Sequence, residues 1–176
     1  MDTQWPRYEV FQQEAPDKPV LHNGSVHAPD IEMALLNARD VFARRPEASQ
    51  MWVAAAERIT SRTRQELAAG EPAPSAAGEP QTYCIFGKLA EQAQASLLGE
   101  VQAASGAAAI AAAQTEFETQ NVLRWCAVPL AALLKSDPAE AGPMFAPARE
   151  KTYKDQAEYP VVTMMRKLRA GKGLDE

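Results

Sequence analysis

The chain has 176 residues, which fits one ordinary domain or two small ones. Its 46% hydrophobic content is globular in scale, although much of it is alanine, which buries little area per residue. The formal net charge of −5 argues against a basic surface that would attract nucleic acid or an anionic membrane. We therefore expect neither nucleic acid nor a membrane as a partner.

The chain start lacks the basic residues and apolar run of a signal peptide. No later stretch has the roughly 20 apolar residues that cross a bilayer, so the sequence predicts a cytoplasmic protein. Cys84 and Cys126 stand far apart, outside any Cys-x-x-Cys or Cys/His pattern. We expect both to be buried free thiols, because neither a disulfide nor a metal site is indicated.

The first structured region predicts two strands, a helix and a third strand. Residues 8–11 and 20–28 are rich in β-branched and aromatic side chains and flank a turn-forming segment, which favours a hairpin. Apolar side chains then recur at helical spacing over residues 31–42, behind Asp30 as an N-cap. The short apolar run at 51–55 predicts a strand within a sheet.

The same β-β-α-β order recurs about 75 residues later, which indicates an internal duplication. The residues that correspond without a gap are Tyr8, Val10, Phe11, Gly24, Val26, Ala28, Ala34, Ala38 and Phe42, matched in order by Tyr83, Ile85, Phe86, Gly99, Val101, Ala103, Ala109, Ala113 and Phe117. A two-residue deletion after the helix brings Trp52 onto Trp125, so we expect each tryptophan to fill the core beneath its helix. The second helix, capped by Ser105, is nearly all alanine and should bury less.

The sequence predicts four parts. These are a first repeat at 1–67, a linker rich in proline, alanine and glycine at 68–82, a second and diverged repeat at 83–135, and a carboxy-terminal tail at 136–176. The expected fold is α+β, with the two repeats packed as a pseudo-two-fold intramolecular dimer that the linker is long enough to permit. Four prolines argue against a long helix before Pro160, so the tail is expected to be largely irregular and to wrap on another surface.

His22 and His27 are the candidates for a metal ligand or a general base. An odd spacing along a strand places them on opposite faces, so they cannot share one metal unless a bulge intervenes. The chain contains no Glu-x-x-His pair and no Gly-x-Ser-x-Gly elbow, and Gly171-Lys172-Gly173 lacks the strand and helix of a phosphate-binding loop. The sequence therefore predicts no catalytic residue, no bound cofactor and no metal.

Recognisable motifs lie near both ends of the chain. The first group is Trp5-Pro6-x-Tyr8-Glu9-Val10-Phe11, Gly24-Ser25-Val26-His27-Ala28-Pro29-Asp30, Glu32-Met33-Ala34-Leu35, Asn37-Ala38-Arg39-Asp40-Val41 and Arg44-Arg45. The second is Ser136-Asp137-Pro138, Met144-Phe145-x-Pro147-Ala148, Lys151-x-Tyr153 and Tyr159. They resemble the phenylacetic acid degradation B-subunit family over residues 5–59 and 134–160. The ordinary member of that family has one repeat, so this chain looks like a member expanded by a second, diverged repeat.

The resemblance implies a non-catalytic structural subunit of a phenylacetyl-CoA epoxidase-like multicomponent monooxygenase, active in aerobic aromatic degradation. A separate subunit would carry the di-iron site, a structural companion would pair with it, and this chain would bridge those pairs. Self-association of the chain is a further expectation. A reductase with flavin and an iron–sulfur cluster would supply electrons, and neither cofactor is expected on this chain.

Partner contacts are expected at the chain start, after the first helix and in the tail, because interface energy concentrates in aromatic and arginine side chains. The expected residues are Trp5, Tyr8, Arg44, Arg45, Phe145, Arg149, Tyr153 and Tyr159. Alternatively, the tail aromatics fold back over the chain's own repeats. The alternative function is a stand-alone ligand-binding protein or enzyme that uses His22 or His27 in a pocket between the repeats.

Overall fold

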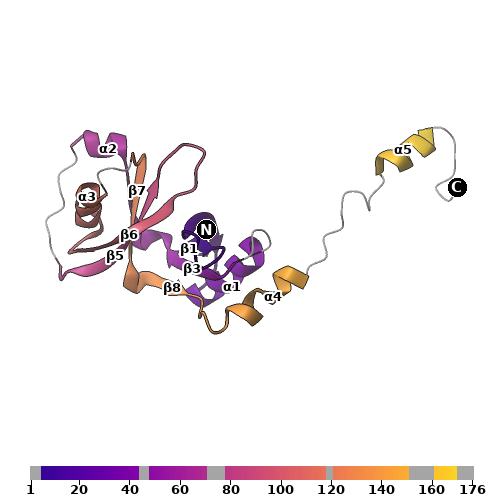
Figure 1. Cartoon of the computed structure of the whole chain (residues 1–176), viewed down its shortest axis with the longest axis horizontal. Helices are drawn as coiled ribbons and strands as arrows, with labels where there is room; N and C mark the ends of the chain where they lie inside the picture. Colours follow the sequence, from indigo (N-terminus) through magenta and orange to yellow (C-terminus); the bar gives the residue numbers. More distant parts are fainter. Residues whose placement is uncertain (1–4, 44–47, 71–77, 118–120, 151–160, 170–176) are drawn as a thin grey trace.

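The computed structural model describes residues 5–43, 48–70, 78–117, 121–150 and 161–169 (Figure 1). Within these ranges the fold is mixed α+β, which confirms the predicted class, and one antiparallel sheet contains eight strands. Residues 5–70 form what we call the first half and residues 78–135 the second half. The predicted linker includes residues 71–77, which lie outside the described ranges.

The two halves contain similar series of strands and helices. The first contains β1 (Arg7–Gln13), β2 (Leu21–His27), α1 (Ile31–Phe42), β3 (Gln50–Ala55), the 3-10 helix η1 (Ala56–Arg58), β4 (Thr60–Thr63) and α2 (Arg64–Ala68). The second contains β5 (Gln81–Lys88), β6 (Ser96–Ala103), α3 (Gly106–Glu116), β7 (Arg124–Pro129), the 3-10 helix η2 (Leu130–Ala132) and β8 (Leu133–Lys135). Two helices follow, α4 (Ala141–Glu150) and α5 (Val161–Arg169).

The sheet joins the halves at three places. Its strand order is β4-β7-β5-β6-β2-β1-β3-β8, so β2 meets β6 at the centre, where Leu21 lies opposite Ser96. The short final strand of each half is exchanged, because β4 pairs with β7 of the second half and β8 pairs with β3 of the first. The halves are therefore interlocked at both ends of the sheet as well as at its centre.

Side-chain caps fix the starts of the two main helices. The Asp30 carboxylate accepts a hydrogen bond from the Met33 backbone N–H at 2.7 Å, and the Ser105 hydroxyl accepts one from Ala108 N–H at 3.2 Å. Both predicted caps are confirmed. No helix in the described ranges is long and apolar enough to span a membrane.

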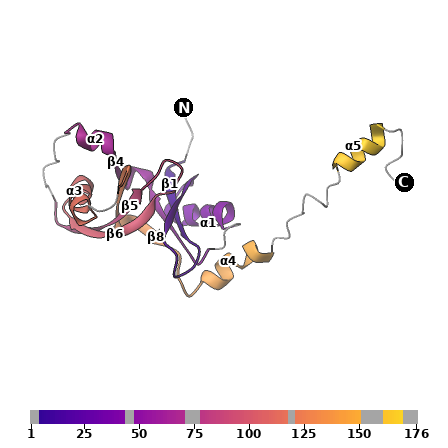
Figure 2. The ribbon, with the colours of Figure 1, turned by 45° about the horizontal axis from the view of Figure 1, so that its top comes forward.

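Each main helix covers its own half of the sheet and encloses its own core (Figures 1 and 2). Val10 and Met51 are fully buried beneath α1, and Ile85 and Trp125 are buried beneath α3. A third core, which we call the central cluster, lies on the opposite sheet face and draws on both halves. The position of this third core explains how two small units share one hydrophobic interior.

The expected equivalence of Trp52 and Trp125 is wrong. Phe11 lies opposite Trp52 across β1 and β3, whereas Phe86, the predicted counterpart of Phe11, lies opposite Cys126 across β5 and β7. The counterpart of Trp52 is therefore Cys126. A slip of one residue moves a strand side chain to the other sheet face, so Trp125 packs beneath α3 while Trp52 lies in the central cluster.

The expected irregular tail is also wrong in the part of it that the structure describes. Residues 141–150 form α4, although Pro147 lies inside the helix. Phe145 is only 2% exposed and packs into the core beneath α1, accompanied by Ala141 and Met144. Burial of the Phe145 ring supplies the packing that holds this short helix despite the lost backbone hydrogen-bond donor.

Candidate functional site

The structure distributes the expected partner residues over very different environments. Trp5 is 57% exposed, whereas Tyr8 and Phe145 are buried in the core beneath α1. Phe145 therefore anchors α4 to its own chain. For this residue, the structure agrees with the alternative that the tail aromatics fold back over their own chain. Of the others, Arg149 has its backbone in α4, while Arg44, Arg45, Tyr153 and Tyr159 lie outside the described residues.

A hydrogen bond ties Trp5 to the end of β2, which is in turn bonded to α1. His27 Nδ1 donates to the Trp5 carbonyl oxygen at 2.7 Å, and the Ala28 N–H donates to the Pro6 carbonyl at 3.2 Å. The Asn37 side chain on α1 donates to the His27 carbonyl at 3.2 Å. His27 thus positions the amino-terminal segment, and the side chain of Trp5 remains exposed.

Helix α1 presents an apolar stripe to solvent. Met33, Leu36 and Val41 are 41%, 42% and 57% exposed, and we call these three residues the α1 stripe. The same helix buries the small residues Ala34 and Ala38. The sequence contained a signal for this stripe that was missed. The signal is that apolar residues surround more of this helix than one core-facing side requires.

The corresponding surface of α3 has no such stripe. Its exposed positions include Ala111 and Ala112, followed by the polar residues Gln114, Thr115 and Glu116. Ala111 stands at the position that corresponds to Leu36, given the 75-residue period. Of these two helices, α1 is therefore the one with large apolar side chains that a partner protein could bury.

A pocket of about 510 Å³ lies between the halves, on the sheet face that carries the central cluster. Strands β1, β2 and β4 line it from the first half, and β5 and β7 from the second. We call it the central pocket. Its charged lining comes from Arg7, Glu9, His22, Lys88 and Arg124.

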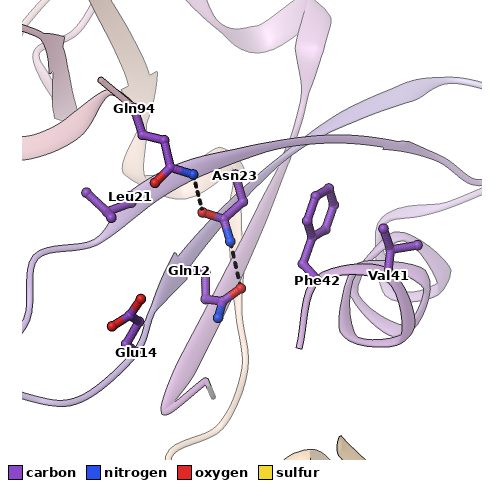
Figure 3. Close-up of a pocket in the computed structure, with 7 residues that line it drawn as sticks. All are labelled: Gln12, Glu14, Leu21, Asn23, Val41, Phe42 and Gln94. Carbon is purple, nitrogen blue, oxygen red and sulfur yellow. Dashed lines mark hydrogen bonds between the residues drawn. The ribbon is translucent and has the colours of Figure 1, made fainter. Parts of the chain in front are cut away.

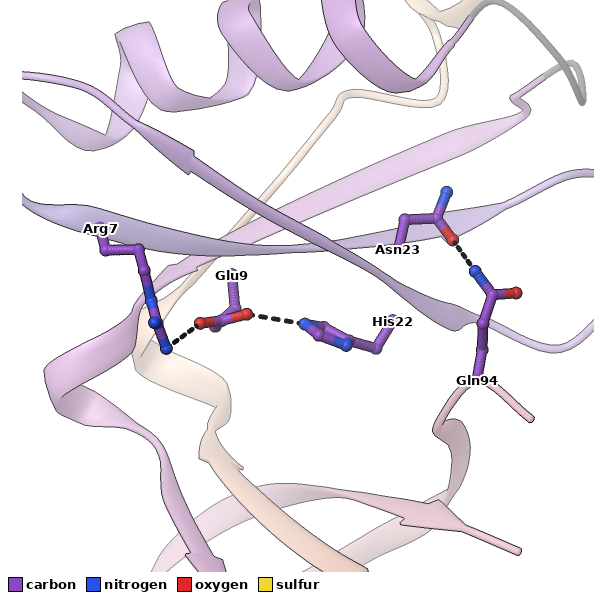
Figure 4. Close-up of polar contacts among 5 residues, drawn as sticks. All are labelled: Arg7, Glu9, His22, Asn23 and Gln94. Carbon is purple, nitrogen blue, oxygen red and sulfur yellow. Dashed lines mark hydrogen bonds and ion pairs between the residues drawn. The ribbon is translucent and has the colours of Figure 1, made fainter. Parts of the chain in front are cut away.

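Glu9 is the centre of a small ionic network in this pocket (Figure 4). Its carboxylate pairs with the Arg7 guanidinium at 2.7 Å and with His22 Nε2 at 2.7 Å. The hydrogen bond from His22 is the main cause that lowers the pKa of Glu9, and the charges of His22 and Arg7 lower it further against the opposing effect of burial. The sequence reasoning missed this role, because Glu9 on its own resembles a solvent-facing strand residue.

The two histidines therefore have separate roles. His22 faces the central pocket, as the alternative function required of one histidine, while His27 holds the chain start. Among the described residues, no group of three His, Cys, Asp or Glu side chains is placed to hold a metal ion. Both cysteines are free thiols, as predicted; Cys84 is buried, and Cys126 is half-buried and lines the pocket.

A smaller cavity of about 250 Å³ lies beside the end of α1 (Figure 3). Its amides bond to one another: Asn23 Nδ2 donates to Gln12 Oε1 at 2.7 Å, and Gln94 Nε2 donates to Asn23 Oδ1 at 3.2 Å. Gln94 comes from the β5–β6 connection, so this chain of hydrogen bonds crosses between the halves. The cavity is best explained as part of the junction.

Comparisons with known proteins give one family and one relative. The model of the family described as "Phenylacetic acid degradation B" matches residues 4–75 and 79–166. The B subunit of the 1,2-phenylacetyl-CoA epoxidase of Escherichia coli (strain K12) is 44% identical over 62 residues, which are 35% of this chain and 65% of the relative. The match thus spans just under two thirds of that relative's length. No solved structure matches the chain.

Proposed function

Because the chain belongs to the phenylacetic acid degradation B family, we propose that it is a structural subunit of a phenylacetyl-CoA epoxidase-like multicomponent monooxygenase. Another subunit carries the di-iron site, a companion subunit pairs with it, and this chain bridges those pairs without performing chemistry. The pathway is the aerobic degradation of aromatic compounds through CoA thioesters. The similarity to the B subunit of a 1,2-phenylacetyl-CoA epoxidase supports this class of assembly.

The observation that carries the proposal is the exposed apolar surface of the first half. The α1 stripe and Trp5 belong to the part of the chain that contains the family's amino-terminal motifs, and all four side chains are more than 40% exposed. Large apolar side chains grouped on one helix mark interaction surfaces, and tryptophan is frequent among residues that dominate binding energy. We propose that this surface contacts the catalytic pair.

The halves are proposed to be duplicated units related by an approximate two-fold axis. The strand order supports this. If β1 and β5, β2 and β6, β3 and β7, and β4 and β8 exchange places, the new order is the original order read from the other end of the sheet. The register also supports it, because both hairpins have an irregularity at corresponding places, between Val10 and Phe11 and between Ile85 and Phe86. One chain would then supply the paired scaffold that two copies of a single-repeat member could form.

The tail beyond α4 is proposed as a second contact with the partners. Tyr153 and Tyr159 belong to the carboxy-terminal motifs that resemble the family, Arg149 lies between those motifs, and arginine and tyrosine are common interface anchors. Phe145 is excluded from this set because it is buried within the chain.

A pull-down with matched helix variants tests the proposal. The tagged chain is co-expressed with the catalytic subunit and its companion, as wild type, Leu36→Glu and Ala111→Glu. Both positions are exposed and correspond in the two halves. We expect Leu36→Glu to reduce partner retention by about tenfold or more, the scale of a moderate interface hot spot, and Ala111→Glu to retain wild-type binding.

Circular dichroism spectra of the two variants must match that of the wild type for this comparison to count. Equal retention of partners by both variants would place the contact elsewhere. Ring oxygenation by the purified chain alone would contradict the non-catalytic role.

A further inference from the structure

We propose that the central pocket binds a small organic anion whose charged end lies against Lys88 and Arg124 and whose apolar body lies on Ile59 and Ala95. The chemical class is a carboxylate attached to a compact apolar group. A pocket of about 510 Å³ is within the size range of small-molecule sites. This inference does not depend on the bridging role proposed above.

The charge of the pocket is the first argument. Lys88 and Arg124 lie directly opposite each other on β5 and β7, and both line the pocket. Like charges at directly opposed strand positions are unfavourable. No ion pair found in the described part of the chain includes either residue. The one carboxylate in the lining, Glu9, already pairs with Arg7 and His22.

The lining therefore has three permanent cations, Arg7, Lys88 and Arg124, against a single carboxylate. An anion that bridges Lys88 and Arg124 would turn their repulsion into attraction and would form charge-assisted hydrogen bonds with both. Arginine and lysine differ in geometry, and the planar guanidinium of Arg124 suits the two oxygens of a carboxylate.

The apolar part of the lining is the second argument. The rings of Phe11 and Phe86, one from each half, stack with their centroids 4.2 Å apart at the buried base of the pocket, where they are only 2% and 0% exposed. Ile59 and Ala95 add further apolar surface. A fully hydrated ion such as inorganic phosphate would gain nothing from these walls, whereas an aromatic or aliphatic body would be removed from water there.

The difference between corresponding positions is the third argument. Trp52 lies opposite Lys135 across β3 and β8, with the Lys135 ammonium 4.0 Å from the indole centroid. At the corresponding place across β7 and β4, Cys126 lies opposite Ser61, and both line the pocket. Trp52 and Lys135 on one side of the central cluster thus correspond to two small side chains, Cys126 and Ser61, on the other. The smaller pair leaves a space open in the pocket that Lys88 and Arg124 line.

Binding is measured on the full-length chain by isothermal titration calorimetry, with sodium benzoate as the probe. Benzyl alcohol is the neutral analogue, and inorganic phosphate is the anion without an apolar body. We expect saturable binding of one benzoate per chain, with no saturable binding of benzyl alcohol or phosphate. Because the contact is ionic, the affinity should fall as salt is raised.

Variants locate the binding site. Lys88→Gln and Arg124→Gln should each weaken benzoate binding by about tenfold or more. Lys18→Gln removes the same charge from an exposed turn, where Lys18 lies 3.8 Å from Asp17, and should leave binding unchanged. Cys126→Trp introduces the side chain found at the corresponding position and should abolish binding by filling the pocket.

Absence of saturable benzoate binding would overturn the inference. So would equal binding of benzyl alcohol, equal binding of phosphate, or unchanged affinity in both Lys88→Gln and Arg124→Gln. If Cys126→Trp does not fold, the benzoate affinities of Lys88→Gln and Arg124→Gln decide whether the inference holds.

Discussion

At the scale of single residues, the chemistry of this chain is concentrated at Glu9. Its carboxylate contacts the Arg7 guanidinium on β1 and the His22 imidazole on β2, and faces the central pocket. Because Glu9 pairs with Arg7 and His22, the one carboxylate in the pocket lining does not pair with Lys88 or Arg124. A residue in an alternating strand pattern thus has a role that only the pairing of β1 with β2 makes visible.

We predict that Glu9→Gln destabilises the chain at pH 7 by about 1 kcal/mol, because the charge-assisted contacts with Arg7 and His22 are weakened. The pKa of Glu9 is lower in the folded chain than its ordinary value of 4.5. Its stabilisation is therefore complete above the unfolded pKa and is lost as pH falls through the folded pKa. The difference between wild type and variant should accordingly shrink below pH 4.5.

Urea unfolding at pH 7, 5 and 3.5 checks the Glu9 prediction, with Glu14→Gln at an exposed turn position as the matched control. A difference between wild type and Glu9→Gln that stays constant over this range would show that the carboxylate charge is not what stabilises the network.

At the scale of elements, the sequence predicted what is local. Alternation and apolar spacing indicated β1, β2, α1 and β3 and their later counterparts, because each buries one regular face. The strands β4 and β8 were not predicted, since they are only four and three residues long and β4, with the sequence TSRT, shows no apolar alternation. Their partners lie in the other half, and local pattern contains no information on such pairing.

The same limit explains the errors at Trp52 and in the tail. A one-residue shift in the turn after the helix cannot be read from the sequence when tryptophan occurs near both candidate positions, yet it changes the sheet face of the side chain. The prolines in residues 141–150 disfavour a helix locally. The buried contact of Phe145 with the first half overrides that local preference. For the site, the sequence singled out His22, Phe11 and Phe86 but not Lys88 or Arg124, because the convergence of these residues at the central pocket depends on how the halves meet.

We predict that Phe145→Ala destabilises the fold by about 3–5 kcal/mol, the usual cost of removing a buried phenylalanine ring. The backbone N–H of Ser136 donates to the Met51 carbonyl at 2.8 Å, and its hydroxyl accepts from the Met51 N–H at 3.0 Å, so the tail is integrated with β3 from its first residue. Deletion from Ser136 onward should therefore also destabilise the chain.

Deletion of residues 151–176 removes none of these contacts and should leave the unfolding midpoint near that of the wild type while reducing partner retention. Chemical denaturation followed by circular dichroism and the co-expression pull-down give both readouts. A large loss of stability in the 151–176 deletion would contradict this division of the tail, as would full partner retention.

At the scale of the whole molecule, the exchange of β4 and β8 makes each half depend on the other. Each half supplies the edge strand of its neighbour, and the central cluster takes its rings from both. Neither half keeps a complete sheet or a complete core when separated from its neighbour. The chain should therefore behave as one cooperative unit.

We predict a single unfolding transition with the same midpoint for reporters in different cores. Trp5→Phe/Trp52→Phe leaves Trp125, which reports the core beneath α3, and Trp5→Phe/Trp125→Phe leaves Trp52, which reports the central cluster. Within each variant, tryptophan fluorescence and far-ultraviolet circular dichroism should give coincident urea curves. Separated transitions in either variant would show that the halves fold independently.

The mass of the assembled complex tests the bridging role most directly. Native mass spectrometry is performed on the catalytic subunit and its companion, purified with and without this chain. A bridging subunit predicts single catalytic pairs in its absence and, in its presence, a particle that contains this chain together with more than one catalytic pair. If the catalytic pairs have the same stoichiometry with and without this chain, or if it binds to one pair only, the chain does not bridge them.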